Sequence, residues 1–319
     1  SVLSLNQSYG PLTYPGEPIE LARVATSRLR PLRAVSLTQF DGLSFIPTTG
    51  RQLGQFSVDG DFTNASASEA NAERMTVTLT GTKPPWLFTP GEVVRANGLG
   101  RRTLRIFEDG AVSVNPALGQ DSQYTVTARN LDPGPAKLLA APTLEPWQVS
   151  QESLEINPGG ATPVVVAPLW GATPLPPETF GQYAEVARLS REVVAGATTQ
   201  YEAVNRIERY LRDAPFVYDE KTPRAVGRPE LINFLLTTRV GYCQHFAGSM
   251  ALMLRMNGIP ARVAVGLNVS ASRYDAGTQT YRVVDRDAHS WVEVDFGEEY
   301  GWLAFDPTPG RSAANSASV

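Results

Sequence analysis

The sequence predicts an α+β fold that is preceded by a β-rich domain, and three features of the chain support this prediction. Short segments of alternating polarity, separated by Gly, Pro and Asp, fill residues 1–130. Apolar residues then recur every three or four positions from residue 176, and strand-like segments return after residue 261. Helices followed by strands within one segment are typical of an α+β domain.

The first part, residues 1–150, is expected to form a sandwich-like β domain. Residues 75–81 and 123–130 alternate apolar and polar side chains, as half-buried strands do. Residues 103–115 contain two short strand-like runs around an Asp-Gly pair, which is a strong hairpin signal. Because these segments gather no cluster of His, Cys or carboxylates, the chemistry of the chain is expected in its second half.

A proline-rich connection, residues 151–175, should hold one or two strands and lead into the helices of the second domain, residues 176–310. Helical periodicity covers residues 176–196 and 198–213, and the second helix begins with a capping-box pattern of Thr199 and Glu202. A short helix is expected at 229–236 with Pro229 near its first turn.

The segment 241–262 predicts the central helix, because it is apolar on most faces and ends at Asn257-Gly258. Strands should follow at 261–269, 279–285, 288–296 and 301–307, so that this helix packs on an antiparallel sheet. The last residues, 311–319, are small and polar and are expected to form a flexible tail.

Composition excludes several classes of function. The net charge is −4 and no basic stretch stands out, so a nucleic-acid partner is not expected. The longest apolar runs are far shorter than the roughly 20 residues that span a bilayer, and the first residues do not resemble a signal peptide. The start without Met and the polar tail suggest a piece of a longer protein. A single cysteine excludes an intrachain disulfide and multi-cysteine zinc sites.

That cysteine, Cys243, is expected in the first turn of the central helix. There the helix dipole and the unpaired N–H groups would stabilise a thiolate, and the same N–H groups could bind an oxyanion. The alternative is a small buried side chain, because free cysteine is among the most buried residue types. The position of Cys243 alone leaves both interpretations open.

A thiolate nucleophile needs a base, and only His245 and His289 are available. His245 lies about 200° around the helix from Cys243, so it points away from the thiol and is interpreted as a packed or capping residue. On a strand, His289 shares one face with Trp291, Glu293 and Asp295, a polar set that suits a site. The alternative is that this set is simply the wet face of a half-exposed strand.

A third group should orient the imidazole, and Asp306 is the candidate. If residues 301–307 form a hairpin with 288–296, the residue opposite His289 is about 309, so that Asp306 comes near the histidine. The alternative is an Asp-Pro turn that only ends the strand. Spacing alone does not choose between the two.

Three motifs, "GYCQHFAGSMALMLRMNGIPARVAVG", "DAHSWVEV" and "GWLAFDPTPG", resemble the core motifs of the transglutaminase-like superfamily, in the order Cys, His, Asp. The resemblance implies a papain-like core with Cys243 as nucleophile, His289 as base and Asp306 as the orienting carboxylate. It also implies a thioester with an acyl donor, which an amine resolves by transamidation or water by hydrolysis. No calcium-loop pattern is present, so neither a metal nor a cofactor is expected.

The resemblance extends upstream. Residues 201–223 resemble the helix and Phe-x-Tyr segment of the family, and residues 32–45 resemble a strand of bacterial membrane-anchored proteins of the TgpA type, in which Phe40 and Phe45 replace the expected aromatic residues. This implies a soluble, monomeric extracytoplasmic part, periplasmic or at the cell surface, of a bacterial membrane protein. Its transmembrane helices would lie outside this chain, and its partner would be a protein or peptide substrate.

Two alternatives to acyl transfer stay open at this point. The same three residues would serve a cysteine peptidase that acts on peptides or cell-wall amides. A catalytically silent binding module could also keep the fold. The sequence identifies no substrate-binding residue, and Tyr218, Gln244 and Trp170 are only weak candidates for an oxyanion donor beyond the backbone of Cys243.

Overall fold

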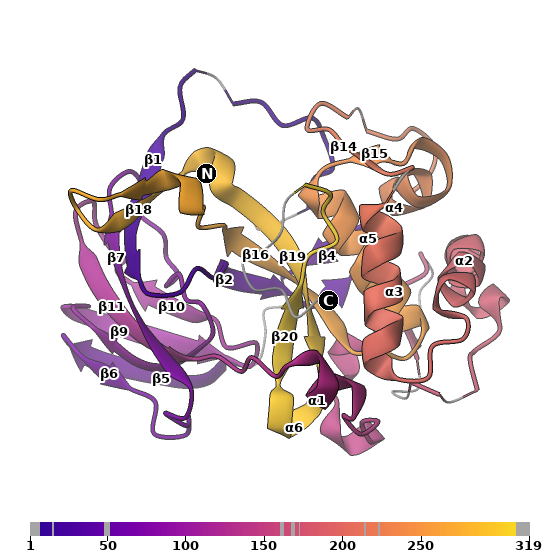
Figure 1. The fold of residues 1–319 in the computed structure, drawn as a ribbon, viewed down its shortest axis with the longest axis horizontal. Helices are drawn as coiled ribbons and strands as arrows, with labels where there is room; N and C mark the ends of the chain where they lie inside the picture. The colour runs from indigo at the N-terminus through magenta and orange to yellow at the C-terminus, as the bar shows by residue number, and fades with distance from the viewer. Residues whose placement is uncertain are drawn as a thin grey trace.

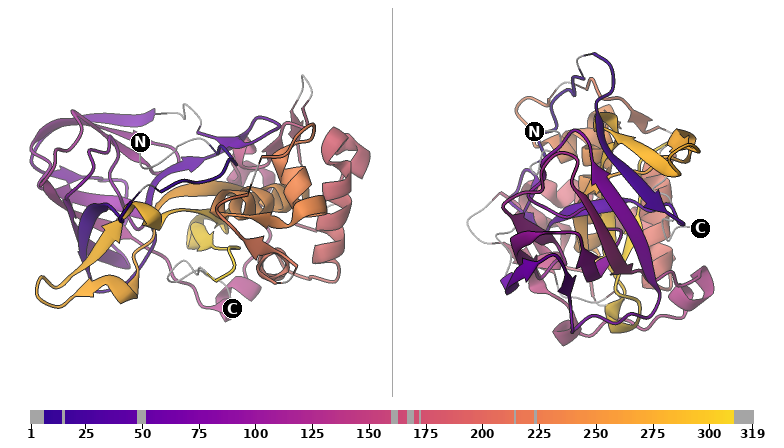
Figure 2. Two further views of the ribbon diagram at one scale, coloured as in Figure 1. Left: turned by 90° about the horizontal axis from the view of Figure 1, so that it is seen from above. Right: turned by 90° about the vertical axis from the view of Figure 1, so that its left-hand side faces the viewer.

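The computed structural model describes residues 7–14, 16–47, 52–159, 163–166, 170–171, 173–213, 215–222 and 224–310. A β-rich lobe lies on one side, a four-stranded sheet in the middle and a layer of helices on the other side (Figure 1). The view from above shows the same order of layers (Figure 2). The predicted α+β class with a β-rich N-terminal region is confirmed. The predicted tail, 311–319, lies outside the described residues.

The β-rich lobe contains two sheets. One runs in the order β17 (Tyr274–Asp275), β18 (Thr280–Val284), β1 (Glu20–Thr26), β7 (Ala72–Leu79), β11 (Gln123–Arg129), β8 (Glu92–Asn97) and β6 (Phe62–Thr63). The other runs β10 (Val112–Asn115), β9 (Arg101–Phe107) and β5 (Gln52–Asp59). Buried side chains of both sheets, such as Val77 and Leu104, belong to one hydrophobic core, so the sheets pack as a sandwich. The β9–β10 hairpin matches the predicted one.

The four-stranded sheet runs in the order β2 (Leu32–Leu37), β16 (Ala261–Leu267), β19 (Ala288–Asp295) and β20 (Trp302–Phe305). Every pair in it is antiparallel, as predicted for the sheet under the central helix. One face of the sheet, represented by Val263, Val292 and Phe305, lies in the same core as the helices.

Each half of the chain contributes a strand to the other half's sheet. From the first half, β2 pairs with β16 of the four-stranded sheet. From the second half, β18 pairs with β1 of the sandwich. The boundary expected near residue 150 is therefore crossed twice by hydrogen-bonded strands. This exchange connects the sandwich to the sheet that carries His289.

The helical layer consists of α2 (Ala184–Val194), α3 (Gln200–Arg212), α4 (Glu230–Asn233) and α5 (Cys243–Met256). The predicted helix 176–196 is a 3₁₀ segment up to Tyr183, because Gly181 has φ of 52° and interrupts the α geometry. Thr199 caps α3 as predicted and accepts from the N–H of Glu202 at 3.2 Å. Among the described residues no helix is long and apolar enough to cross a membrane.

The central helix α5 is buried along nearly its whole length and packs on β16 and β19. Its last turn carries one charged side chain, Arg255, which is fully buried. The guanidinium donates to the carbonyl oxygens of Thr38, Glu155 and Ala261 at 2.6, 2.7 and 2.8 Å. Arg255 thus joins α5, β16, the end of β2 and the connection, where β12 (Glu155–Ile156) pairs with β13 (Val164–Val165).

Candidate active site

The helix α5 begins at Cys243, as the sequence predicts. The preceding strand β15 (Val240–Gly241) pairs in parallel with β14 (Val217–Tyr218), and Tyr242 is the extended N-cap residue. The Cys243 side chain is 6% exposed. The N–H groups of His245 and Phe246 donate to the carbonyl oxygen of Tyr242, so the N–H groups of Cys243 and Gln244 are the ones nearest the thiol, at the positive end of the helix dipole.

Gly241 permits this tight entry into the helix. A Cβ atom at this position would lie 2.6 Å from Cγ of His245 and 2.8 Å from its Cβ. Any other residue would therefore push the His245 ring, and with it the first turn of α5, away from its place.

His245 is a packed and capping residue, which confirms its interpretation from the sequence. Its Nδ1 accepts from the N–H of Tyr242 at 3.3 Å, and its Nε2 lies 3.5 Å from Oε1 of Glu230. Burial opposes ionisation of Glu230, but the bond to His245 helps to lower the pKa of that carboxyl overall. The ring is fully buried and contacts Tyr9.

The structure brings His289 and Asp306 together. Nε2 of His289 lies 2.8 Å from Oδ2 of Asp306, and both side chains are buried. The hairpin register pairs Val292 with Phe305, so its continuation places Asp306 opposite Trp291, two residues from His289. Oδ1 of Asp306 also accepts from the N–H of Thr308 at 3.0 Å. Asp306 therefore ends the strand and bonds the histidine at once.

Cys243 also affects the pKa of this imidazole. Burial alone would lower the pKa of His289, but the charge and hydrogen bond of Asp306, together with Cys243, outweigh burial and raise this pKa from 6.5 to about 10. Nδ1 of His289, the nitrogen not used by Asp306, is buried and has no aligned hydrogen-bond partner among the described residues. Catalytic hydrogen bonds are often poorly aligned without substrate. Nε2 of His289 is thus engaged by Asp306, while Nδ1 is the ring nitrogen that remains without such a bond among the described residues.

Trp291 covers the histidine from its own strand. The two rings stack with centroids 6.4 Å apart and an interplanar angle of 21°. Trp291 is 1% exposed. The indole therefore forms a buried wall beside the imidazole of His289.

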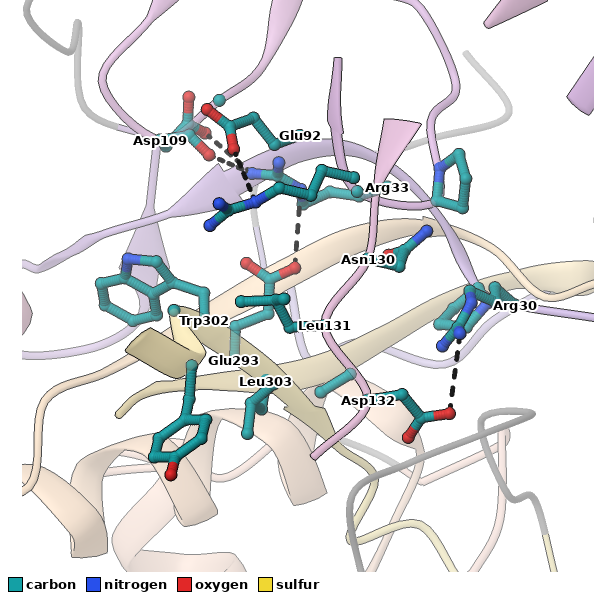
Figure 3. Close-up of a pocket in the computed structure, with 18 of the residues that line it drawn as sticks. Arg30, Arg33, Glu92, Asp109, Asn130, Leu131, Asp132, Glu293, Trp302 and Leu303 are labelled. Atoms are coloured by element: carbon teal, nitrogen blue, oxygen red, sulfur yellow. Dashed lines mark hydrogen bonds and ion pairs between the residues drawn. The ribbon is translucent and has the colours of Figure 1, made fainter. Parts of the chain in front are cut away.

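The rest of the predicted polar face of β19 forms ion pairs. Glu293 accepts from Arg262 at 2.7 Å and lies 3.5 Å from Nε of Arg33. These residues line a cavity of about 290 Å³ between the sandwich and the sheet face that points away from α5 (Figure 3). In that view Arg33 lies between Asp109 and Glu293. Neither Cys243 nor His289 lines this cavity, so its charges connect the two lobes and do not form part of the thiol site.

The three weak candidates for an oxyanion donor have different outcomes. Trp170 lines a cavity beside Met256 and Gly258, at the opposite end of α5, so this hypothesis is wrong. Tyr218 lies beside Gly241 in the β14–β15 pair, but its hydroxyl donates to Glu220 at 2.9 Å. The backbone N–H groups that begin α5 remain the donors best placed for an oxyanion.

The N-terminal segment, residues 7–10, holds the side chain of Gln244, and this contact was not predicted from the sequence. Its Oε1 accepts from the N–H of Ser8 at 3.0 Å. The hydroxyl of Tyr242 donates to the carbonyl oxygen of Gly10 at 3.0 Å. This segment therefore fixes residues on both sides of Cys243 and occupies the carbonyl end of the Gln244 amide.

A second feature missed by the sequence reasoning lies on α3. The Glu208 carboxylate accepts from the backbone N–H of Asp306 at 2.9 Å. The Arg212 guanidinium donates to the carbonyl oxygen of Asp306 at 3.1 Å. A signal was present, because Glu208 is a charged residue within the apolar stripe that contains Val204 and Leu211.

The raised pKa of His289 predicts a pH-dependent contribution to stability. Unfolded histidine titrates near 6.5 and native His289 near 10. Its stabilisation is therefore fully present below pH 6.5 and is lost as pH rises through about 10. Urea unfolding should show that His289→Gln loses more free energy of unfolding at pH 6 than at pH 10. The protein with His289 and the His289→Gln variant should both carry Cys243→Ala, so that titration of the thiol does not enter the comparison. A pH-independent difference between them would contradict the assignment.

The comparisons with known proteins come from sequence and from structure. Residues 187–307 match the family model of the transglutaminase-like superfamily. The chain is 46% identical over 95 residues to the protein-glutamine gamma-glutamyltransferase of Pseudomonas aeruginosa and 35% identical over 130 residues to the uncharacterized protein YebA of Bacillus subtilis. These matches cover 30% and 39% of this chain but only 14% and 17% of the two relatives.

The fold is similar to that of the periplasmic domain of TgpA from Pseudomonas aeruginosa, in a crystal structure bound to ethylmercury. The TM-score is 0.59 at 21% sequence identity, and the match covers 91% of this chain and 90% of that chain. At this identity the likeness concerns the fold. It spans the sandwich as well as the helical half.

Proposed function

Because residues 187–307 form a transglutaminase-like domain, we propose that this chain is a thiol acyltransferase that acts on glutamine side chains of proteins through Cys243. The observation that carries this proposal is the arrangement at the start of α5. Cys243 lies at the positive end of a buried helix and contributes to the raised pKa of His289, whose Nε2 is 2.8 Å from a buried carboxylate.

In the first half-reaction the Cys243 thiolate attacks the carboxamide carbon of glutamine. The carbonyl oxygen becomes an oxyanion, for which the N–H groups at the start of α5 are the proposed donors. His289, protonated through its raised pKa, gives its Nδ1 proton to the departing nitrogen. Ammonia leaves, the C–N bond breaks and a thioester remains on Sγ.

In the second half-reaction a primary amine attacks the thioester carbon. Neutral His289 takes a proton from the amine, the C–S bond breaks and the thiolate returns. Asp306 stays ionised throughout, fixes the ring through Nε2 and stabilises the imidazolium. Water in place of the amine gives glutamate, which is the hydrolytic outcome of the same site.

The relative named protein-glutamine gamma-glutamyltransferase supports transfer to an amine over hydrolysis. The likeness to a periplasmic domain supports an extracytoplasmic location in a bacterial membrane protein. A protein or peptide is the proposed substrate, and the domain is proposed to act as a monomer.

The proposal is tested with a glutamine-containing peptide, with and without a fluorescent alkylamine. We expect amine incorporation and one ammonia released per amine incorporated. Ammonia release without incorporation of the amine would show that water resolves the thioester, which would make the chain a glutaminase. Cleavage of the peptide chain would favour the peptidase alternative. No turnover under any condition, although the thiol reacts with iodoacetamide, would favour a binding module.

A further inference from the structure

Two charged side chains of α3 hold the backbone of Asp306. Oε1 of Glu208 accepts from the N–H of Asp306 at 2.9 Å, and Nη1 of Arg212 donates to the Asp306 carbonyl oxygen at 3.1 Å. Glu208 and Arg212 are four residues apart, so they lie one turn apart on the same face of the helix. Both backbone polar groups of one residue are thus held by one helix.

The position of Asp306 explains why it needs such support. Strand β20 ends at Phe305, so the sheet no longer fixes the backbone at Asp306. On the side-chain end, Oδ1 accepts from the N–H of Thr308 and Oδ2 bonds Nε2 of His289. The contacts from α3 therefore begin at the residue where strand pairing ends.

Glu208 lies where an apolar residue would be expected. It is 3% exposed and its neighbours on the stripe, Val204 and Leu211, are fully buried. A buried carboxylate is costly unless it is hydrogen-bonded, and apolar side chains usually fill such stripes. The bond to the N–H of Asp306 accounts for a carboxylate at this position.

We propose that Glu208 is a positioning residue of the active site, which together with Arg212 holds Asp306 so that its carboxylate meets His289. The inference rests on the proposed function, since it assigns Glu208 a role only through the Asp306–His289 pair. Among the described residues, Cys243 lies beside the imidazole, Glu208 and Arg212 face the pair from α3, and Tyr201 lies next to Glu208.

The experiment compares Glu208→Met, which removes the acceptor at similar volume, with Glu208→Gln, which keeps an amide oxygen. The chain has two histidines and one cysteine, so histidine NMR signals and thiol alkylation report on His289 and Cys243 with little overlap. In Glu208→Met the titration midpoint of His289 should fall by about one unit or more, because Asp306 is the main group that raises it. Alkylation of Cys243 at pH 6 should slow about tenfold to a hundredfold. Glu208→Gln should retain most of the rate.

Glu192→Gln, an exposed substitution on α2, is the control and should alter neither readout. If Glu208→Met does not fold, Arg212→Met provides the test, with a shift in the same direction. A folded Glu208→Met or Arg212→Met with wild-type titration and alkylation would overturn the inference. Neither readout needs a substrate. Absence of amine incorporation by the wild type would therefore refute the proposed function, while the titration would still decide the role of Glu208.

Discussion

Replacement of Cys243 by alanine will abolish amine incorporation into a glutamine-containing protein, with no turnover above the uncatalysed background. The chain has no second cysteine that could act in its place. Alanine at the start of α5 keeps the helix dipole and the N–H donors but removes the atom that forms the thioester. The measurement is incorporation of a fluorescent amine, compared with the wild type at equal protein concentration.

His289→Asn should reduce amine incorporation without abolishing it, in contrast to Cys243→Ala. The thiol remains, but the group that holds and returns the proton is lost, so the rate should fall about 10²- to 10⁴-fold. Thermal unfolding is the control for Cys243→Ala, which removes one small side chain and should change the free energy of unfolding by no more than about 1 kcal/mol. Residual activity of Cys243→Ala in the range of His289→Asn would contradict the thioester mechanism.

Replacement of Arg255 by methionine will destabilise the fold more than any surface substitution. The guanidinium is fully buried and satisfies the carbonyls of Thr38, Glu155 and Ala261. Burial lowers the pKa of Arg255, so the charge itself is costly. Removing the buried charge recovers part of the lost stability. The three carbonyl oxygens left without a donor, however, cost about 1 to 3 kcal/mol each in the free energy of unfolding. We expect a net loss of about 3 kcal/mol in the free energy of unfolding, measured by urea denaturation.

Arg209→Met is the matched control, because Arg209 is exposed on α3. It should change stability by less than about 0.5 kcal/mol. An Arg255→Met protein as stable as the Arg209→Met protein would show that the three carbonyls find other partners or water.

The site residues are recognisable in the sequence because each lies at an element boundary with a local signal. Gly241 and Tyr242 lead into an apolar helix, which places Cys243 in its first turn. His289 begins an alternating strand, and Asp306 follows the last apolar strand before a proline. The hairpin spacing predicts a partner of His289 near residue 309, and the observed register differs from this by one residue.

The partners of two strands could not be predicted. Nothing in residues 32–37 distinguishes a strand of the sandwich from a strand beside β16, because both of its faces carry apolar side chains and all six residues are buried. Likewise only the last two residues of β18, Val283 and Val284, are buried, yet the strand pairs with β1, more than 250 residues away. Such choices are decided by long-range packing, which local periodicity does not encode.

The support around the site is only partly visible in the sequence. Glu208 and Arg255 can be noticed as charges within apolar stripes, but their acceptors and donors lie in distant segments. The N-terminal residues 7–10 show no periodicity at all. Their contacts with Tyr242 and Gln244 are hydrogen bonds that follow from the folded arrangement.

The central claim is that Cys243 carries the acyl group, and intact-protein mass spectrometry tests it most directly. The wild type is incubated with a glutamine-containing peptide without amine and quenched in acid. With one cysteine in the chain, the expected result is a single adduct with the mass of the peptide less ammonia, located on Cys243 and released by hydroxylamine. Turnover without such an adduct, or the same adduct on Cys243→Ala, would contradict the account.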